Sequence, residues 1–390
     1  MTVIIFLLVL AVLIFVHELG HFLFARWNKI RVDEFKIGFG PRILSWGKGE
    51  TKYGLNLIPF GGYVKIHGEN PDLESISGAD KDRSFVNKKA WQQVAVLAAG
   101  VLFNFIFAWI IYIIVFIAGV TATPEGFERH SANFENERVM ITMVSPGSPA
   151  DKAGLKVGDA ISFIGTEKIV SAPSDSRIGD VASDPDIKMP IEIIQNKINA
   201  SKGEPISLTI MRGVGDKETS VDQYTYEKTV QPTEGIVKDK YAIGIAMSEV
   251  VDLKLPFFSA IYEGGRYTLV MIRETAIGLY DFFGNIFRGQ ANFSDVAGPI
   301  GIAGIVGGAA ELGFTYLLMV TALISINLGV INLIPFPALD GGRILFVLIE
   351  SVIRRKIKPV YANTVNTIGF VLLMLLMVVV TYKDIVKMFK

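Results

Sequence analysis

The sequence predicts a polytopic α-helical membrane protein with four transmembrane helices, a β-hairpin region and an inserted α+β domain. Hydrophobic residues make up 51% of the 390-residue chain and charged residues 19%, with a mean hydropathy of +0.43. This apolar excess over soluble proteins is modest. Four apolar stretches approach the roughly 20 residues that cross a bilayer, and the segments between them are polar. The chain therefore combines membrane spans with water-soluble segments.

The predicted spans share long apolar runs with few charges, and they cover residues 1–27, 92–120, 314–338 and 362–383. A cleaved signal peptide is the alternative interpretation of the first run. It requires a basic leader and a small-residue cleavage site. Here only Met1 and Thr2 precede the run, and bulky residues follow it. We therefore interpret the first run as a span.

Three shorter segments lie outside the spans. Residues 28–91 contain two short β-like runs around Pro-Phe-Gly-Gly, which predict a β-hairpin over 53–66. Residues 251–313 interleave aromatic and charged side chains, as in an amphipathic helix at a membrane interface, and then become glycine-rich. We expect the glycine-rich stretch 298–308 to be an irregular lead into the third span. Residues 339–361 form a loop that begins with Leu-Asp-Gly-Gly.

The longest polar segment, 121–250, has short alternating strands and turn signals, which predict a folded domain of ordinary size. Its stretch 144–159 predicts a short helix bracketed by turns. Residues 170–205 lack this pattern, and we interpret them as an insertion or long loop.

The charged residues predict which partners the chain binds and how it is oriented in the membrane. Lys+Arg and Asp+Glu are each 38, so the chain lacks the basic surplus that nucleic-acid binding requires. Lysine and arginine are frequent in 28–91 and 339–361, which places both loops on the cytoplasmic side and 121–250 outside. Three lysines near the C-terminus run against this orientation. The bilayer is thus a partner, and the oligomeric state stays open.

The chain has no cysteine and only four histidines, so a thiol nucleophile, a disulfide and a cysteine-rich zinc site are excluded. His17 and His21 frame Glu18 in a His-Glu-Leu-Gly-His motif. Histidines at i and i+4 share one helix face and can bind one Zn²⁺, while the glutamate between them can serve as a base. Two helix histidines without a metal are the alternative. It is disfavoured in a span, because unpartnered polar groups are costly there.

A catalytic zinc site has three protein ligands, and Asn-Leu-Ile-Pro-Phe-Pro-Ala-Leu-Asp-Gly-Gly at 332–342 offers a third. Its two prolines must interrupt the helix, and Asp340 is an ionisable residue in an apolar setting. Asp340 could instead cap the next helix. Beside a histidine pair that lacks a third ligand, we expect it to bind the metal. Asn332 could hold a substrate backbone or cap freed backbone groups.

Together, HELGH in the first span and NLIPFPALDGG in a later one resemble the site-2 protease family of intramembrane zinc metalloproteases. The resemblance implies that His17, His21 and Asp340 bind zinc, that Glu18 is the base and that Asn332 contacts substrate. It also implies that 53–66 is a membrane-associated hairpin on the cytoplasmic side. Its substrate-binding residues, which pair with an extended peptide, would be Gly61, Gly62 and Tyr63.

The stretch 144–159 resembles the helix and Gly-Asp turn of a PDZ domain, which completes the predicted fold class with an inserted PDZ-like α+β domain. A PDZ domain can bind peptides by adding a strand to a sheet edge. The alternative is a β-rich domain that only occupies space or gates access sterically. The sequence departs from the family pattern in two places. Arg343 stands where some relatives have histidine, and only one outer domain is evident where some relatives have two.

These expectations lead to a zinc metalloendopeptidase that cuts single-span membrane proteins or peptides, such as anti-sigma factors or remnant signal peptides, in a bacterial inner membrane. Its active site would face the cytoplasmic side. The alternative is a catalytically inactive, PDZ-bearing membrane adaptor. A prenyl-protein peptidase is disfavoured, because that class lacks both the PDZ-like insertion and the Leu-Asp-Gly segment.

Overall fold

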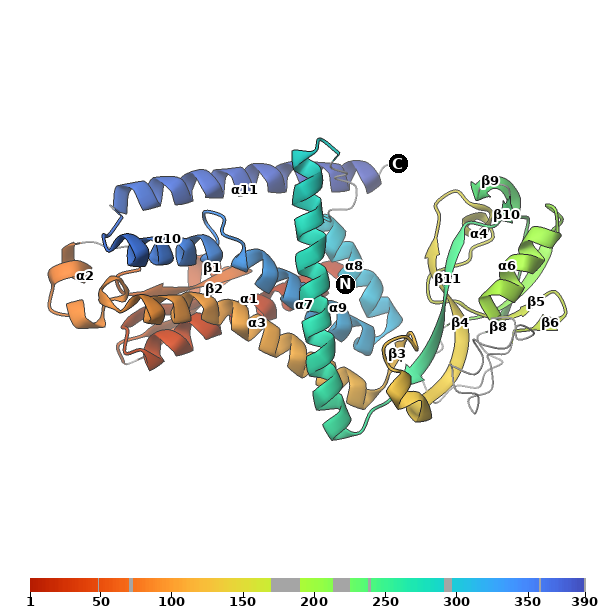
Figure 1. Ribbon diagram of the computed structural model, residues 1–390, viewed down its shortest axis with the longest axis horizontal. Coiled ribbons are helices and arrows are strands. Elements are labelled where there is room, and N and C mark those ends of the chain that lie inside the picture. The colour runs from red at the N-terminus through yellow and green to blue at the C-terminus, as the bar shows by residue number, and fades with distance from the viewer. Residues whose placement is uncertain are drawn as a thin grey trace. The chain divides into compact units, whose positions relative to one another are not determined.

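The computed structural model contains two compact units. Unit 1 comprises Met1–Ile114 and Ile261–Lys390, and unit 2 comprises Val115–Ala260. The long apolar helices belong mainly to unit 1, whereas most strands belong to unit 2 (Figure 1). The residues that the structure describes are 1–47, 49–69, 73–169, 190–212, 225–237, 240–290, 297–357 and 359–388.

Within the described residues, four helices are long and apolar enough to cross a membrane, which confirms the predicted number of spans. They contain 26, 29, 20 and 30 residues. At 1.5 Å per residue each therefore extends about 30 Å or more, enough for the hydrocarbon core. The four helices are α1 (Thr2–Trp27), α3 (Ala90–Ala118), α9 (Phe314–Leu333) and α11 (Pro359–Met388).

Helix α9 ends at Leu333, short of the predicted limit of the span at 338. Pro335 and Pro337 follow, and neither can donate a backbone hydrogen bond to a continuing helix. Ala338 then adopts a left-handed conformation, with φ of +75°. The chain thereby leaves the helix axis and begins a new helix, α10 (Asp340–Ile353).

Two glycines allow α10 to start directly against the end of α9. A Cβ atom on Gly341 would lie 2.3 Å from the carbonyl oxygen of Leu333, and one on Gly342 would lie 2.2 Å from that of Phe336. Both distances are shorter than real contacts, so any larger residue would push α10 away from the break. The Leu-Asp-Gly-Gly segment thus fixes where Asp340 lies.

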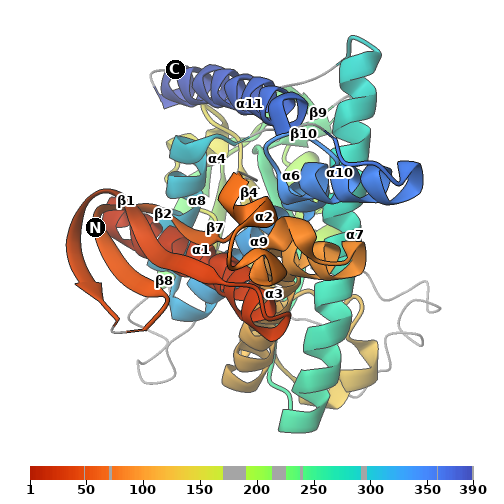
Figure 2. The same ribbon diagram turned by 90° about the vertical axis from the view of Figure 1, so that its left-hand side faces the viewer.

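The sheet of unit 1 consists of β1 (Val32–Trp46) and β2 (Lys52–Ile66), which run side by side and bend together (Figure 2). Residues 34–37 of β1 pair with 62–65 of β2 and also with 52–55 of β2. The prediction of a hairpin within 53–66 is therefore wrong in its pairing, since the two halves flank β1. The physical reason is that 32–46 is itself a strand, and its backbone pairs with both halves of β2 at once.

Helix α1 packs on this sheet. Phe22 and Ala25 of the helix lie in one buried cluster with Phe35 and Val64 of the strands. Burial of aromatic and aliphatic side chains is the main favourable term in such packing. The sheet is therefore held against the same helix that carries the His-Glu-Leu-Gly-His motif.

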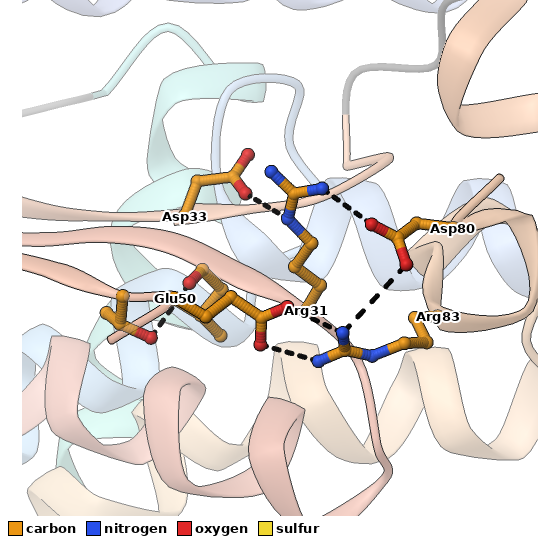
Figure 3. Close-up of polar contacts among 7 residues, drawn as sticks. Arg31, Asp33, Glu50, Asp80 and Arg83 are labelled. Atoms are coloured by element: carbon orange, nitrogen blue, oxygen red, sulfur yellow. Dashed lines mark hydrogen bonds and ion pairs between the residues drawn. The ribbon is translucent and has the colours of Figure 1, made fainter. Parts of the chain in front are cut away.

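Ion pairs connect β1 to the segment that leads into α3 (Figure 3). Arg31 lies 2.7 Å from Asp33 and 2.7 Å from Asp80, and Arg83 contacts both carboxylate oxygens of Glu50 at 2.5 and 2.6 Å. The Arg31 guanidinium holds the pKa of the Asp80 carboxyl below its ordinary value. Exposed pairs of this kind contribute little each, but together they fix the connector on the sheet. The connector contains α2 (Leu73–Ser77) and the short 3-10 helices η1 (Lys81–Arg83) and η2 (Phe85–Asn87).

The segment predicted as an amphipathic helix followed by an irregular glycine-rich stretch forms two helices, α7 (Phe257–Phe287) and α8 (Pro299–Leu312). The expectation of irregular structure over 298–308 is wrong. Pro299 is preorganised for the first helical turn. A Cβ on Gly307 would lie 2.3 Å from a side-chain carbon of Thr2, so this glycine lets α8 approach α1 closely.

Unit 2 is built on a sheet of strand order β3-β11-β4-β5-β7-β8, with β6 paired to β5. Strands β9 and β10 pair separately. The strands are β3 (Val120–Ala122), β4 (Phe134–Val144), β5 (Ala160–Ile164), β6 (Glu167–Lys168), β7 (Ile206–Met211), β8 (Thr225–Val230), β9 (Thr233–Val237), β10 (Lys240–Ala242) and β11 (Ile245–Leu253). The helices are η3 (Glu128–Asn133), α4 (Pro149–Lys152) and α6 (Pro190–Ala200).

Helix α6 corrects one further expectation. Its Ile194 and Ile198 are buried in the core of unit 2 with Ile161 and Leu208 of the sheet. Part of the predicted insertion, 170–205, therefore belongs to the domain core, while its first part, 170–189, lies outside the described residues. The polar sequence of α6 conceals an apolar stripe at helical spacing, which only packing against the sheet reveals.

Candidate metal centre

Helix α1 presents the first three site residues because their spacing matches the helical repeat. His17 and His21 are one turn apart, so their rings lie on the same face. The ring centroids are 4.8 Å apart at 85° to each other. Glu18 follows His17 and is half-buried on the neighbouring face. The helix geometry therefore places two imidazoles and a carboxylate close together.

Asp340, at the start of α10, completes the cluster from a position more than 300 residues further along the chain. Its Oδ2 atom lies 3.1 Å from Nε2 of His17 and 3.4 Å from Nε2 of His21. The two Nε2 atoms are 3.2 Å apart. All three side chains are largely buried, with exposed fractions of 12%, 10% and 16%. Three potential ligand atoms thus converge on one point.

These separations fit a tetrahedral zinc ion. Ligand atoms that surround zinc at about 2.0–2.1 Å with tetrahedral angles lie about 3.3 Å from one another. The observed distances of 3.1, 3.2 and 3.4 Å bracket that value. In addition, Oδ2 of Asp340 is buried and accepts no hydrogen bond of good geometry from the described residues. The donor set and the orphaned oxygen both match a metal ligand.

The two imidazoles also act on the pKa of the Asp340 carboxyl. Burial alone would raise its pKa, but its contacts with the imidazoles of His17 and His21 lower the pKa below the ordinary value. A carboxylate must be ionised to act as a metal ligand.

Helix α3 orients both imidazoles from behind. Nδ1 of His21 donates to the backbone carbonyl of Val96 at 2.9 Å, which leaves the Nε2 lone pair for a metal. The side-chain amide of Asn104 lies 3.1 Å from Nδ1 of His17. Rotated by 180° about its terminal bond, the amide presents its oxygen to Nδ1–H of His17. A histidine that binds a metal through Nε2 carries its proton on Nδ1 and needs such an acceptor. Asn104 also accepts a hydrogen bond at its backbone carbonyl from Ser325 of α9, at 2.8 Å.

Sequence reasoning missed Asn104 and Gly100, although both carried a signal. Asn104 is a polar residue within a long apolar helix, and such residues usually have a functional partner. A Cβ on Gly100 would lie 2.4 Å from Nε2 of His21 and 2.7 Å from Cε1 of His17. Glycine is therefore required where α3 passes the imidazoles.

The sheet meets the site at Glu18. The backbone N–H of Val64 donates to Oε2 of Glu18 at 3.0 Å. Gly62 lies nearby, since a Cβ there would be 3.6 Å from Cγ of Glu18. Because Val64 pairs with Phe35 on its other side, the free edge of 62–66 faces the glutamate. Val64 is a site residue that sequence reasoning could not supply, as only its backbone is used.

The remaining predicted residues lie on two elements, β2 and α9. Gly61 has a left-handed φ of +94°, which favours glycine at the bend before the edge. The hydroxyl of Tyr63 donates to Glu34 at 2.8 Å, so this side chain is engaged within the sheet. Asn332 is half-buried in the last turn of α9, and it is not one of the converging ligands. Their roles as substrate contacts stay predictions.

Comparison with known proteins decides the family. The model of a family described as Peptidase family M50 matches residues 5–376, nearly the whole chain. The chain belongs to peptidase family M50. The family resemblance that the HELGH and LDGG motifs predict is thereby confirmed.

Relatives match this M50 chain over 97% or more of its length. A candidate zinc metalloprotease of Clostridium perfringens is 37% identical over 99% of both chains. The zinc metalloprotease RasP of Geobacillus kaustophilus is 30% identical, covering 100% of this chain and 98% of the relative. A candidate zinc metalloprotease of Rhizobium meliloti is 30% identical over 97% of this chain and 95% of its own. The RasP alignment spans 462 positions, so that protein contains segments absent here.

Proposed function

We propose that this M50 peptidase is a zinc endopeptidase that cuts single-span membrane proteins or peptides within or near the bilayer. The observation that carries the proposal is the convergence of His17, His21 and Asp340 on one point beside Glu18. The relatives named as zinc metalloproteases support the metal and the reaction class.

His17, His21 and Asp340 would hold the zinc ion, which when bound makes water more acidic and polarises a peptide carbonyl. Val96 and Asn104 hold the two imidazoles in position. Glu18 lies next to the ligands without being one of the three converging atoms, so it is free to exchange protons. It would take a proton from the attacking water and later deliver it to the leaving amine.

The substrate would bind as an extended strand. A transmembrane helix hides its peptide groups in internal hydrogen bonds, so it must unwind before hydrolysis. The free edge of 62–66 offers unpaired backbone groups directly beside Glu18. Gly61, Gly62 and Tyr63, at the start of this edge, would bind the substrate backbone by strand addition, and the Asn332 amide would also contact the substrate backbone.

Unit 2 would select or gate substrates. Its sheet and the short helix α4 support the PDZ-like interpretation, and strand addition is again the mode that such a domain uses. By the distribution of lysine and arginine, unit 2 would lie outside a bacterial inner membrane and the hairpin region inside. Anti-sigma factors or remnant signal peptides are the substrate types that we propose.

The substitution Glu18→Gln tests the role of the base. Glutamine keeps the size of the side chain but cannot take a proton. Removal of a general base lowers the rate by about 10²–10⁴-fold. We expect one zinc ion per chain to remain, measured by atomic spectroscopy, and cleavage of a membrane-anchored reporter to fall at least a hundredfold.

The outcomes separate the two functions. Undiminished cleavage by Glu18→Gln would contradict the assignment of the base. If the unsubstituted chain held no stoichiometric zinc and cut no membrane-anchored reporter, the inactive adaptor would be the better description. The same Glu18→Gln protein can retain bound membrane peptides, and their identification would name the substrate.

A further inference from the structure

A second polar site lies in unit 1, where the start of α3 meets the end of α10. A cavity of about 260 Å³ opens there. Its floor includes Gln93 and Val347, which are only 4% and 8% exposed. Its rim carries four cationic side chains, Lys88, Arg354, Arg355 and Lys356. None of these residues belongs to the metal centre.

The positive charge of this cavity is not neutralised by its surroundings. Glu350 is the one carboxylate among the lining residues. It already accepts the N–H of Ile357 at 2.8 Å and lies 3.4 Å from Nζ of Lys356. Within the part of the chain that the structure describes, no carboxylate lies at ion-pair distance from Lys88, Arg354 or Arg355. The cavity therefore presents a surplus of positive charge to a ligand.

Hydrogen bonds hold the walls in place. Nζ of Lys356 donates to the backbone carbonyl of Val86 at 2.9 Å, which joins the end of α10 to the connector. The amide of Gln93 donates to the carbonyl of Lys88 at 2.8 Å. Arg354 ends α10 in a left-handed conformation, with φ of +56°. The cavity is thus preformed. It also lies at the amino end of α3, where the helix dipole favours anions.

The cavity lies where two spans begin. Helix α3 starts at Ala90, two residues after Lys88, and the candidate span of α11 starts at Val360, four residues after Lys356. Positions this close to the ends of spans lie at the level of lipid headgroups. A free anion from solution and a membrane lipid both reach this depth, so a further observation must separate them.

That observation is the outer face of α10. Leu345, Leu348 and Val352 follow helical spacing and are 40%, 49% and 83% exposed. Trp91, at the start of α3, is 63% exposed. A helix with an exposed apolar stripe and a cationic end lies in the membrane interface, and exposed tryptophan is typical of the same level. The stripe lies on the face of α10 turned away from the cavity residues Val347 and Arg354, so it places the helix, and the cationic cavity with it, at the level of the lipid headgroups.

We propose that this cavity binds the phosphate-bearing headgroup of an anionic phospholipid. Lys88, Arg354, Arg355 and Lys356 neutralise the phosphate, and the acyl chains extend into the bilayer. The site is independent of the zinc chemistry and does not depend on the proposed function. Clusters of lysine and arginine next to membrane spans attract anionic lipids with about 1 kcal/mol per cation.

The double substitution Lys88→Gln with Arg355→Gln tests the site on the full chain in a neutral detergent. Binding is measured by native mass spectrometry and by the shift in Tm, with short-chain phosphatidylglycerol, phosphatidylcholine and inorganic phosphate as probes. Of these three probes, we expect only phosphatidylglycerol to bind and to raise the Tm of the protein. Loss of two cations should weaken its binding about thirtyfold, which is about 1 kcal/mol for each cation.

The matched control is Arg42→Gln with Lys52→Gln, which removes two exposed cations from the sheet. It should bind phosphatidylglycerol like the unsubstituted chain. The charge-conserving pair Lys88→Arg with Arg355→Lys should also retain binding, which separates charge loss from misfolding. Equal affinity in the Gln pair and its control would overturn the proposal. Tight binding of inorganic phosphate alone would overturn the assignment to a lipid.

Discussion

At the scale of single residues, the apolar helices of unit 1 carry few polar side chains, and those near the metal centre contact one another. His17 contacts Asn104 and Asp340, and His21 contacts Asp340 and the Val96 carbonyl. Polar groups buried in an apolar environment cost several kcal/mol unless they are partnered. These contacts therefore explain how a span can contain a histidine pair.

Asn104 is the residue whose role can be tested most directly. Groups that orient metal ligands through their second ring nitrogen typically contribute 10- to 100-fold to metal affinity. We expect Asn104→Ala to weaken zinc binding by about that factor, measured by competition with a chelator of known affinity. Asn332→Ala is the control, because Asn332 is not among the converging ligands. Equal zinc affinity in both variants would exclude an orienting role for Asn104.

Sequence reasoning reached His17, Glu18 and His21 because their relation is local, as four residues of helix fix it. Asp340 followed from the need for a third ligand. Val64 was not foreseeable, since its contribution is a backbone N–H that any residue except proline has. Asn104 was visible as a polar residue in a span, but nothing in the sequence indicates which imidazole it contacts.

At the scale of elements, close approach between helices depends on glycine. Gly20 of α1 lies against the backbone of Ala99 of α3, where a Cβ would be 2.4 Å from the carbonyl oxygen. Gly100 lies against both imidazoles. Small residues at such crossings are typical of helix packing in membranes, where no hydrophobic force drives association. The metal centre is assembled at this crossing.

The substitution Gly100→Ala tests the crossing. The added methyl group must displace the imidazoles, so zinc content should fall from one ion per chain to well below half. Gly304→Ala in α8 is the matched control, because nothing lies within 4 Å of a Cβ there. Zinc content is measured on both purified proteins. Full zinc occupancy in Gly100→Ala would show that α3 can shift without cost to the site.

Elements were predictable to different degrees. Length and hydropathy alone locate the four spans, because the thickness of a bilayer sets both. The pairing of 52–66 was not predictable, because its partner strand, 32–46, lies outside the segment that shows the hairpin pattern. The helix α8 was obscured by its glycines, which weaken a helix in water but permit packing against α1.

At the scale of the whole molecule, the orientation in the membrane is predicted only from the distribution of lysine and arginine. The absence of cysteine from the chain gives it a clean test. Lys152 of α4 and Lys52 of β2 are exposed. In spheroplasts, a membrane-impermeant thiol reagent should label Lys152→Cys and leave Lys52→Cys unlabelled, as detected by gel shift. Both should react after detergent lysis. Labelling of Lys52→Cys before lysis would reverse the orientation.

The sequence by itself determined the four spans, the histidine pair with its glutamate and the peptidase family, because each depends on short-range periodicity or on motifs. Only the tertiary structure decided how groups that are distant in the sequence meet. Asp340 reaches the histidines because the proline break after Leu333 and two glycines set α10 against α9. The edge of 62–66 reaches Glu18 because β1 separates the two halves of β2. Such long-range contacts depend on packing, which no local pattern in the chain specifies.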